Sequence, residues 1–377
     1  MTTGLLIALT VYDVAGLVML AVALRLGTPA VRRDVRVLVW GGVGLFAAAI
    51  AAGQVFRGHT GFTAMRFLCH GLACVAAPVM VLRGVWWCRR KSLGWGLLLV
   101  VAGLVVDATY LYARRIEPTW LEVTRYEVVT PRLAGHEPIR VVVLADLQTD
   151  HVGDYERAVF EAMAEERPDL ILMPGDYLQM PRATQAEWRA EQAALHRLFA
   201  EMAHDVRLGI WAVDGDVDSA SITFAGTEIH SIRDELRTVS EDPPVQILGL
   251  SRKGCRQPLT SEQLDQVRAF DGLTIVMGHS PDFAVEMIRT VERDGAAAVS
   301  LPMLCVAGHT HGGQVVVPFF GPPVTLSRVP RRYASGLHEL GRAHLFVSRG
   351  VGHERGYAPR IRFLCRPELA VLTLRGP

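Results

Sequence analysis

Five short motifs in the second half of the chain place acidic or imidazole side chains directly after expected strands. They are Asp146-Leu-Gln148, Gly175-Asp176, Gly215-Asp-Val-Asp218, Gly278-His279 and Gly308-His-Thr-His-Gly-Gly313. Each motif alone is weak evidence, because a Gly-Asp pair is usually a turn. Five in succession at strand ends are poorly explained by chance, and carboxylate, amide and imidazole donors together suit borderline divalent metals. The residue types therefore indicate a metal site with more donors than one ion takes.

The elements that must position these motifs are short apolar runs with strand length, at 139–145, 169–173, 209–213, 273–277 and 303–307. The segments 154–167 and 185–204 are expected to be helices, and further strands are expected at 121–129, 245–250, 345–347 and 369–374. This alternation predicts an α/β or α+β domain with helices covering sheets. Ligands at the carboxyl ends of neighbouring strands converge on one edge of a sheet, so the motifs are expected to meet there.

The first third of the chain has a different composition. The 377 residues are 50% hydrophobic and 20% charged, and the apolar excess lies before residue 114. Four apolar stretches, at 5–24, 37–56, 63–82 and 93–113, each reach the roughly 20 residues that a helix needs to cross a bilayer. Residues 1–115 are therefore predicted to form a four-helix transmembrane domain, and residues 116–377 a water-soluble domain.

Basic residues predict how these helices are oriented. The connections after the first and third stretches carry most of them, namely Arg25, Arg32, Arg33, Arg36, Arg83, Arg89, Arg90 and Lys91. Cytoplasmic loops are enriched in arginine and lysine, so both connections are expected on the cytoplasmic side. The N-terminus and the soluble domain are then expected outside the cytoplasm. The first stretch is not predicted to be a cleaved signal, because residues 1–4 carry no positive side chain.

Several function classes are excluded by composition and spacing. The net charge is +1 and no basic tail is present, so no nucleic-acid partner is expected. Neither of the two lysines, Lys91 and Lys253, ends a glycine-rich phosphate loop, which excludes the P-loop class. The six cysteines form no CxxC pair, so neither a disulfide framework nor a structural zinc site is expected. An EF-hand beginning at Asp214 is also rejected, because Ser219 stands where that loop requires glycine.

The motifs resemble those of the calcineurin-like metallophosphoesterase superfamily, D-x-H, G-D, G-N-H-[D/E], H and G-H-x-H. The tail motifs Arg332-Tyr-Ala-Ser-Gly336, Ser348-Arg-Gly350 and Ile361-Arg-Phe-Leu-Cys-Arg-Pro-Glu-Leu369 are similar to its membrane-associated bacterial branch. The resemblance spans about residues 118–376. It implies a two-sheet sandwich flanked by helices, with two divalent metal ions at the strand ends. Mn²⁺ is the first expectation, with Fe or Zn as alternatives.

The resemblance also implies the ligands and the reaction. One metal would be held by Asp146, Gln148, Asp176 and His311, and the other by Asp176, Asp216, His279 and His309, with Asp176 bridging. Asp146, Asp176, Asp216 and His279 are accordingly the expected catalytic residues. The implied reaction is hydrolysis of a phosphoester, phosphodiester or pyrophosphate bond by a metal-bridging hydroxide.

Two positions depart from the family pattern. Gln148 replaces a histidine, but its carbonyl oxygen can still coordinate a metal. Val217 replaces the histidine that assists charge stabilisation or leaving-group protonation, and this predicts a lower rate or a restriction to good leaving groups. His353 is the candidate replacement proton donor. Arg349, Arg355 and Arg360 are candidate cations for the phosphoryl oxygens.

Three readings of the function remain open from the sequence. The first is a membrane-anchored dimetal phosphohydrolase of the bacterial inner membrane, acting on a phosphorylated small molecule or a lipid-linked substrate. The second is a binding or scaffold protein of the same fold, weak or inactive in catalysis because of Val217. The third is a transport-coupled sensor that uses the intramembrane charges Asp13 and Asp107.

Overall fold

The computed structural model describes residues 60–90 and 92–377, and the chain divides into two compact units. The first, the helical unit, contains the chain up to Ile116 together with Glu354–Ile361; the second, the soluble unit, contains Glu117–His353 and Arg362–Pro377. The division at 116/117 lies beside the expected one at 115/116. The grouping of Glu354–Ile361 with the helices was not expected from the sequence. Within the helical unit, Arg66 Nη1 donates to the carbonyl oxygen of Gly356 at 3.1 Å.

The described part of the helical unit holds three helices, α3 (Thr60–Gly71), α4 (Ala77–Arg89) and α5 (Leu93–Leu111). A π-helical turn joins α3 to α4, so that Phe62–Arg89 runs as one helix of 28 residues. This helix and Leu93–Thr119, of 27 residues, are long and apolar enough to cross a membrane by length and composition. They correspond to the stretches expected at 63–82 and 93–113. The stretches expected at 5–24 and 37–56 lie outside the described residues, so a four-helix region stays a prediction.

Helices α4 and α5 pack closely at glycines. A Cβ atom on Gly84 would lie 2.6 Å from the carbonyl oxygen of Gly96, and one on Gly103 would lie 2.7 Å from that of Ala77. Small residues that let backbones approach in this way are typical of helix pairs in lipid, where packing replaces the hydrophobic effect. On other faces of α5, large apolar side chains such as Leu98 and Val105 are exposed, as a lipid-facing surface requires.

The soluble unit contains two six-stranded mixed sheets, and helices occur in the connections from one strand to the next. The strands are β1 (Glu122–Val129), β2 (Ile139–Val143), β3 (Leu170–Met173), β4 (Ile210–Ala212), β5 (His230–Ser231), β6 (Glu235–Glu241), β7 (Pro244–Gly249), β8 (Leu273–Met277), β9 (Met303–Ala307), β10 (Gly336–Leu340), β11 (Ala343–Val347) and β12 (Glu368–Arg375). The helices are α6 (Asp154–Glu165), α7 (Gln185–Met202), α8 (Ala220–Thr223), α9 (Ser261–Ala269) and α10 (Val285–Asp294).

The first sheet has the order β1-β12-β2-β3-β4-β5 and the second the order β10-β11-β9-β8-β7-β6. Strands β2, β3 and β4 are neighbours and parallel, and so are β7, β8 and β9. Strand β12 is central because it pairs parallel with β1 and antiparallel with β2, which brings the C-terminus into the first sheet. The carboxyl ends of β2, β3 and β4 therefore share one edge, and those of β8 and β9 share another.

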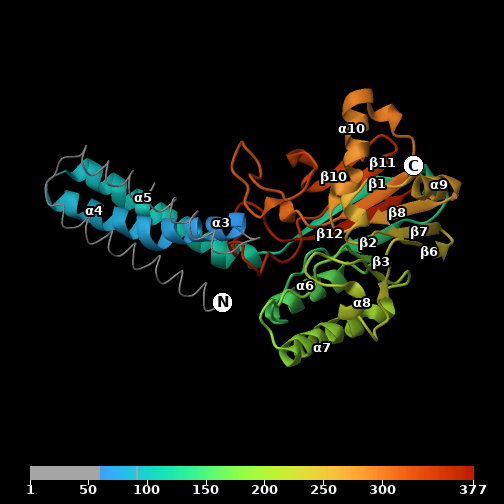
Figure 1. Ribbon diagram of the computed structural model, residues 1–377, viewed down its shortest axis with the longest axis horizontal. Helices are drawn as coiled ribbons and strands as arrows, with labels where there is room; N and C mark the ends of the chain where they lie inside the picture. Colours follow the sequence, from blue (N-terminus) through green and yellow to red (C-terminus); the bar gives the residue numbers. More distant parts are fainter. Residues whose placement is uncertain (1–59, 91) are drawn as a thin grey trace. The chain divides into compact units, whose positions relative to one another are not determined.

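The two sheets pack face to face, and helices cover their outer faces (Figure 1). Val141 and Val143 of β2 point into the core between the sheets, together with Ile247 and Ile275 of the second sheet. Val142 points the other way, onto the helices α6 and α7. On the far side, helix α10 packs against the second sheet. This is the expected two-sheet sandwich flanked by helices.

Strands β5, β6 and β10 were not expected from the sequence. Strand β6 lies at the edge of its sheet, and its seven residues, Glu-Leu-Arg-Thr-Val-Ser-Glu, are half-buried or exposed. Strand β10 is the other edge strand of the same sheet. A strand with one face toward solvent needs no continuous apolar run, because only its other face is covered. The apolar pattern therefore predicts the central strands and misses these edges.

Candidate metal centre

Three carboxylates follow three neighbouring strands of the first sheet. Asp146 follows β2, Asp176 follows β3 and Asp216 follows β4, each within four residues of the strand end. These strands are parallel, so their carboxyl ends lie at one edge and the three side chains are delivered to the same place. Asp146 and Asp176 are buried, and Asp216 is partly exposed.

The imidazoles come from the second sheet. His279 follows β8 and His309 follows β9, which are parallel neighbours. His279 is fully buried, and its Nδ1 lies 2.8 Å from the carbonyl oxygen of Pro174, next to the Gly175-Asp176 turn. The five motifs expected to meet on one sheet edge are thus divided between two sheets whose edges lie together.

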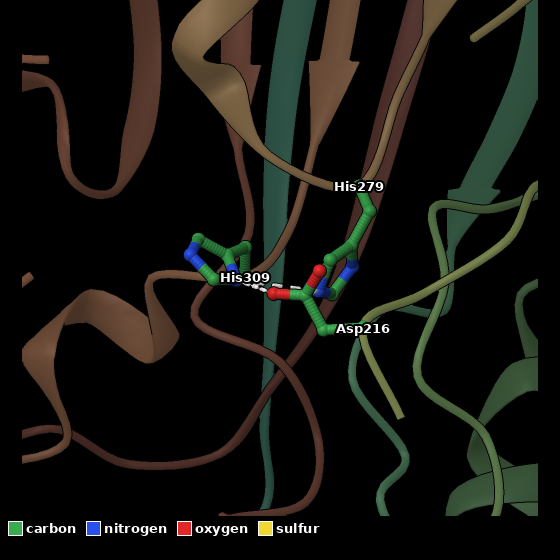
Figure 2. A group of neighbouring side chains, drawn as sticks. All are labelled: Asp216, His279 and His309. Carbon is green, nitrogen blue, oxygen red and sulfur yellow. Dashed lines mark hydrogen bonds and ion pairs between the residues drawn. The ribbon is translucent and has the colours of Figure 1, made fainter. Parts of the chain in front are cut away.

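Asp216, His279 and His309 form one group of donor atoms (Figure 2). Asp216 Oδ2 lies 3.2 Å from His309 Nδ1 and 4.0 Å from His279 Nε2, and the two imidazole nitrogens are 3.3 Å apart. Asp146, Asp176 and His279 form a second group, in which His279 Nε2 lies 3.3 Å from Asp176 Oδ2. His279 belongs to both groups, so the two lie side by side.

The remaining expected ligands border the second group. Gln148 Nε2 donates to Asp176 Oδ2 at 2.7 Å, and His311 Nε2 lies 4.0 Å from Asp146 Oδ1. Asp176 is central, because its Oδ1 also accepts the backbone N–H groups of Asp216 and Val217 at 2.5 and 3.0 Å. All seven expected ligands are therefore within one cluster, and their oxygen and nitrogen donors suit divalent ions.

The backbone at this cluster is strained. Asp146, Gln148, Asp176, His309 and His311 all have φ between +36° and +69°, in the left-handed region that residues with a Cβ rarely adopt. Such conformations cost about 1–3 kcal/mol each and persist where a functional geometry requires them. Five of the seven expected ligands share this conformation, which makes the cluster the candidate functional site independently of any sequence resemblance.

Two glycines allow the ligands to approach the backbone. A Cβ atom on Gly215 would lie 2.0 Å from Asp176 Oδ1, and one on Gly308 would lie 2.5 Å from Asp146 Oδ2. Real Cβ atoms do not approach other atoms so closely. Glycine at these positions is therefore explained by the space that the carboxylates occupy.

Burial and proximity shift the pKa values of these groups. Burial raises the pKa of Asp146 to about 7, and the nearby Asp176 adds to the effect. Burial acts in the same direction on Asp176, but the charge and hydrogen bond of His279 outweigh it and lower the pKa of Asp176. The same balance lowers the pKa of Asp216 to about 2, through its hydrogen bond to His309. Burial opposes protonation of His279, but the surrounding carboxylates raise its pKa well above its usual range.

Two sequence-based expectations concern the loop after β11. His353 is buried and directly follows Gly352, whose N–H donates to the carbonyl oxygen of Asp146 at 2.8 Å. Arg349, one of the candidate cations, lies instead 2.8 Å from Glu122 Oε2 and 3.3 Å from Glu368 Oε1. Its charge is thus engaged by two carboxylates, and its expected role toward the substrate stays a prediction. Arg355 and Arg360 belong to the segment that groups with the helical unit.

Two arginines that were not expected from the sequence lie beside the cluster. Arg256 Nη2 is 2.5 Å from Asp216 Oδ2, and Arg252 Nε is 3.6 Å from Asp216 Oδ1 and 2.9 Å from the carbonyl oxygen of Gly215. Both side chains are half exposed and come from the loop after β7. No motif surrounds them, so only the fold could reveal them. They bring positive charge to the position next to Val217.

Arg362 was also missed as a functional residue. It is fully buried and donates to the carbonyl oxygens of Arg349, Gly350, Gly352 and Cys365. The loop that it holds contributes the N–H groups of Val351 and Gly352 to the backbone of Ala145 and Asp146. Arg362 therefore fixes the loop that supports a candidate ligand.

Two bacterial proteins are similar in sequence to most of this chain. No family model matches the chain. The chain is 27% identical over 290 residues to YkuE of Bacillus subtilis, an uncharacterized metallophosphoesterase, with 74% of this chain and 94% of YkuE covered. It is 28% identical over 294 residues to the phosphodiesterase YaeI of Escherichia coli, with 74% and 97% covered. A dimetal phosphatase from Danio rerio is similar with a TM-score of 0.33 at 14% identity, over 57% of this chain and 88% of that one.

Proposed function

We propose that the chain belongs to the calcineurin-like metallophosphoesterase superfamily and that it is a metal-dependent phosphohydrolase whose active site is the strand-end cluster. The observation that carries this proposal is the set of five strained ligand residues gathered at one point with Asp216 and His279. Strain of this kind is maintained at catalytic sites and has no evident packing purpose here. The two bacterial relatives point to the same chemistry.

The ligand assignment is the one that the family resemblance implies, and the two donor groups contain five of its seven residues. Asp146, Gln148, Asp176 and His311 would hold one divalent ion, and Asp176, Asp216, His279 and His309 the other. Two such ions would supply a water of lowered pKa as the nucleophile and would neutralise the phosphoryl oxygens. Mn²⁺ is proposed, with Fe and Zn as alternatives. The backbone N–H groups of Asp216 and Val217 hold Asp176 through its Oδ1, and its Oδ2 lies 3.3 Å from His279 Nε2.

Val217 replaces a histidine that could carry positive charge. Arg256, with Arg252 beside it, would supply that charge instead. A guanidinium can approach two phosphoryl oxygens at once and stays charged at any physiological pH. Placed next to Asp216, it would stabilise the charge that develops on the nonbridging oxygens. His353 stays the candidate proton donor for the leaving group.

The membrane helices suggest where the enzyme works. The connection between α4 and α5 contains Arg89, Arg90 and Lys91, which favours a cytoplasmic position for that turn. The soluble unit, which begins after α5, would then lie on the extracytoplasmic face of a bacterial inner membrane. A substrate with a phosphate or pyrophosphate linked to lipid suits this location, and a phosphorylated small molecule is the alternative.

A second candidate function rests on one observation, the valine at position 217. If the missing histidine cannot be replaced, the protein would bind metal and a phosphorylated ligand without turnover, as a scaffold. Both candidates predict metal binding, so activity must separate them.

The test combines metal analysis with hydrolysis of bis(p-nitrophenyl) phosphate by the full-length protein. The enzyme proposal expects two metal equivalents and turnover, with both reduced in Asp176→Asn. The matched control is Asp205→Asn, an exposed carboxylate of the same unit, which should behave as the parent. Metal loading without turnover would support the scaffold, and absence of metal would contradict both proposals.

A further inference from the structure

Residues 315–326 form an exposed apolar loop beside the candidate metal centre. The segment Val-Val-Val-Pro-Phe-Phe-Gly-Pro-Pro-Val-Thr-Leu contains no charged residue. Val317, Phe319, Phe320, Val324 and Leu326 are each at least 38% exposed, and Phe319 is as exposed as in an extended chain. Large apolar side chains grouped on one exposed loop mark an interaction surface.

The backbone presents this loop in an ordered way. Val316 N–H donates to the carbonyl oxygen of Phe363 at 2.8 Å, and Val317 and Gly321 exchange two hydrogen bonds of 3.0 and 2.9 Å across the tip. At the tip, Phe319 has a φ of +65°. A glycine would adopt this conformation without strain, whereas a phenylalanine is a genuine outlier there. The aromatic side chain at the tip is therefore kept at a conformational cost, which points to a use for the ring.

Both ends of the loop are attached to the cluster. The segment begins four residues after His311, and at its other end the carbonyl oxygen of Leu326 lies 3.1 Å from His309 Nε2. A partner that holds this loop is thus held next to the candidate ligands.

Positive charge accompanies the apolar tip. The guanidinium of Arg331 stacks on the ring of Phe320, with its Cζ 4.5 Å from the ring centre, and Arg331 is itself exposed. An aromatic residue next to an arginine is the combination that enters the boundary between lipid headgroups and acyl chains. Anionic headgroups attract such a cation from the same direction.

The occupant is a bilayer rather than a second protein. Five side chains on a single loop bury much less area than the roughly 1,200–2,000 Å² of a stable protein interface. The candidate span that ends at Thr119, by contrast, would keep the soluble unit close to a membrane surface, because β1 begins three residues later, at Glu122.

We propose that residues 315–326 insert Phe319 and Phe320 into the membrane interface, so that the phosphate-bearing headgroup of a bilayer lipid is brought to the metal centre. The proposal that the loop inserts into the membrane rests only on the geometry and exposure of the loop. The identification of the headgroup as substrate rests on the proposed function.

The insertion is tested with the full chain in vesicles of phosphatidylglycerol and phosphatidylcholine. Phe319→Cys is labelled with an environment-sensitive NBD dye. The parent protein, treated with the same dye, gives the fluorescence from native cysteines, which is subtracted. Insertion predicts a blue-shifted emission that is quenched by lipids carrying a spin label on the acyl chain. The matched control is Ile222→Cys, an apolar residue of the same unit that is 63% exposed, which should show neither effect. Equal signals at the two positions, or a blue shift without lipid quenching, would overturn the proposal.

The substrate part has its own measurement. The double variant Phe319→Ala/Phe320→Ala should raise the KM for a nitrophenyl phosphodiester with a long acyl chain held in the vesicles by several-fold. Its hydrolysis of soluble bis(p-nitrophenyl) phosphate should equal that of the parent. Equal loss on both substrates would refute a role in lipid presentation. A parent that hydrolyses neither substrate would refute the proposed function, while the quenching result would still decide the insertion.

Discussion

Arg256 Nη2 lies 2.5 Å from Asp216 Oδ2, so a guanidinium borders the carboxylate that precedes Val217. Arg256 and Asp216 are 40 residues apart and come from different sheets. Their contact places a permanent positive charge beside the residue that precedes the position where the family pattern has a histidine. We expect Arg256 to supply the positive charge that is lost with the histidine that Val217 replaces, and two predictions test this.

Arg256→Gln removes this charge while keeping a polar side chain. We expect kcat/KM for a phosphodiester to fall by about 10²-fold, the effect typical of losing one group that stabilises transition-state charge. Metal content should be unchanged, because no expected ligand is altered. Arg268→Gln, which loses only an exposed pair with Asp265, is the control. Loss of metal together with activity would show that Arg256 supports Asp216 instead.

Val217→His restores the side chain of the family pattern. The turn should be preserved, because position 217 serves Asp176 through its backbone N–H. We expect a larger gain on alkyl than on aryl phosphodiesters, on the order of 10²-fold, since general acid catalysis helps poor leaving groups most. Val217→Gln, which introduces a polar side chain without a titratable proton, is measured on the same two esters as the control. An equal gain on both esters would argue against a missing proton donor.

Metal removal should destabilise the soluble unit. Three carboxylates crowd together in the cluster, and bound cations would offset their repulsion. An ion at 100 times its dissociation constant stabilises the folded state by about 2.7 kcal/mol. Chelation should therefore lower the Tm of the parent, and added Mn²⁺ should restore it. Asp176→Asn should show little of this response; a full response in that variant would contradict the assignment of Asp176 as the bridging ligand.

Arg362→Met tests the buried arginine that holds the loop after β11. The variant leaves several buried carbonyl oxygens without their donor, and each such group costs about 1–3 kcal/mol. We expect a loss of about 3 kcal/mol in the free energy of unfolding, measured in urea. Arg342→Met makes the same chemical change at an exposed turn and should cost little. Similar losses in the two variants would mean that the carbonyl contacts of Arg362 contribute nothing specific.

The central strands and the candidate ligands could be predicted from the sequence because both leave a local signal. Buried strands such as 273–277 and 303–307 are continuous apolar runs, and the strand boundaries found agree with those expected. The motifs follow these strands directly, so Asp146, Asp176, His279 and His309 were identified before their positions in space were known. The edge strand β6 left no such signal, because half-buried polar residues also occur in loops.

The sequence by itself determined the residue types, their attachment to strand ends and the division between an apolar and a soluble part of the chain. Only the tertiary structure decided that the carboxylates come from one sheet and the imidazoles from another. It also decided that Arg256 reaches Asp216 and that Glu122 and Glu368 engage Arg349. The physical reason is that periodicity and turn chemistry act over a few residues, whereas these contacts form when two sheets pack across one core. The surroundings of a charged side chain such as Arg256 or Arg349 therefore depend on the partners that tertiary packing brings to it.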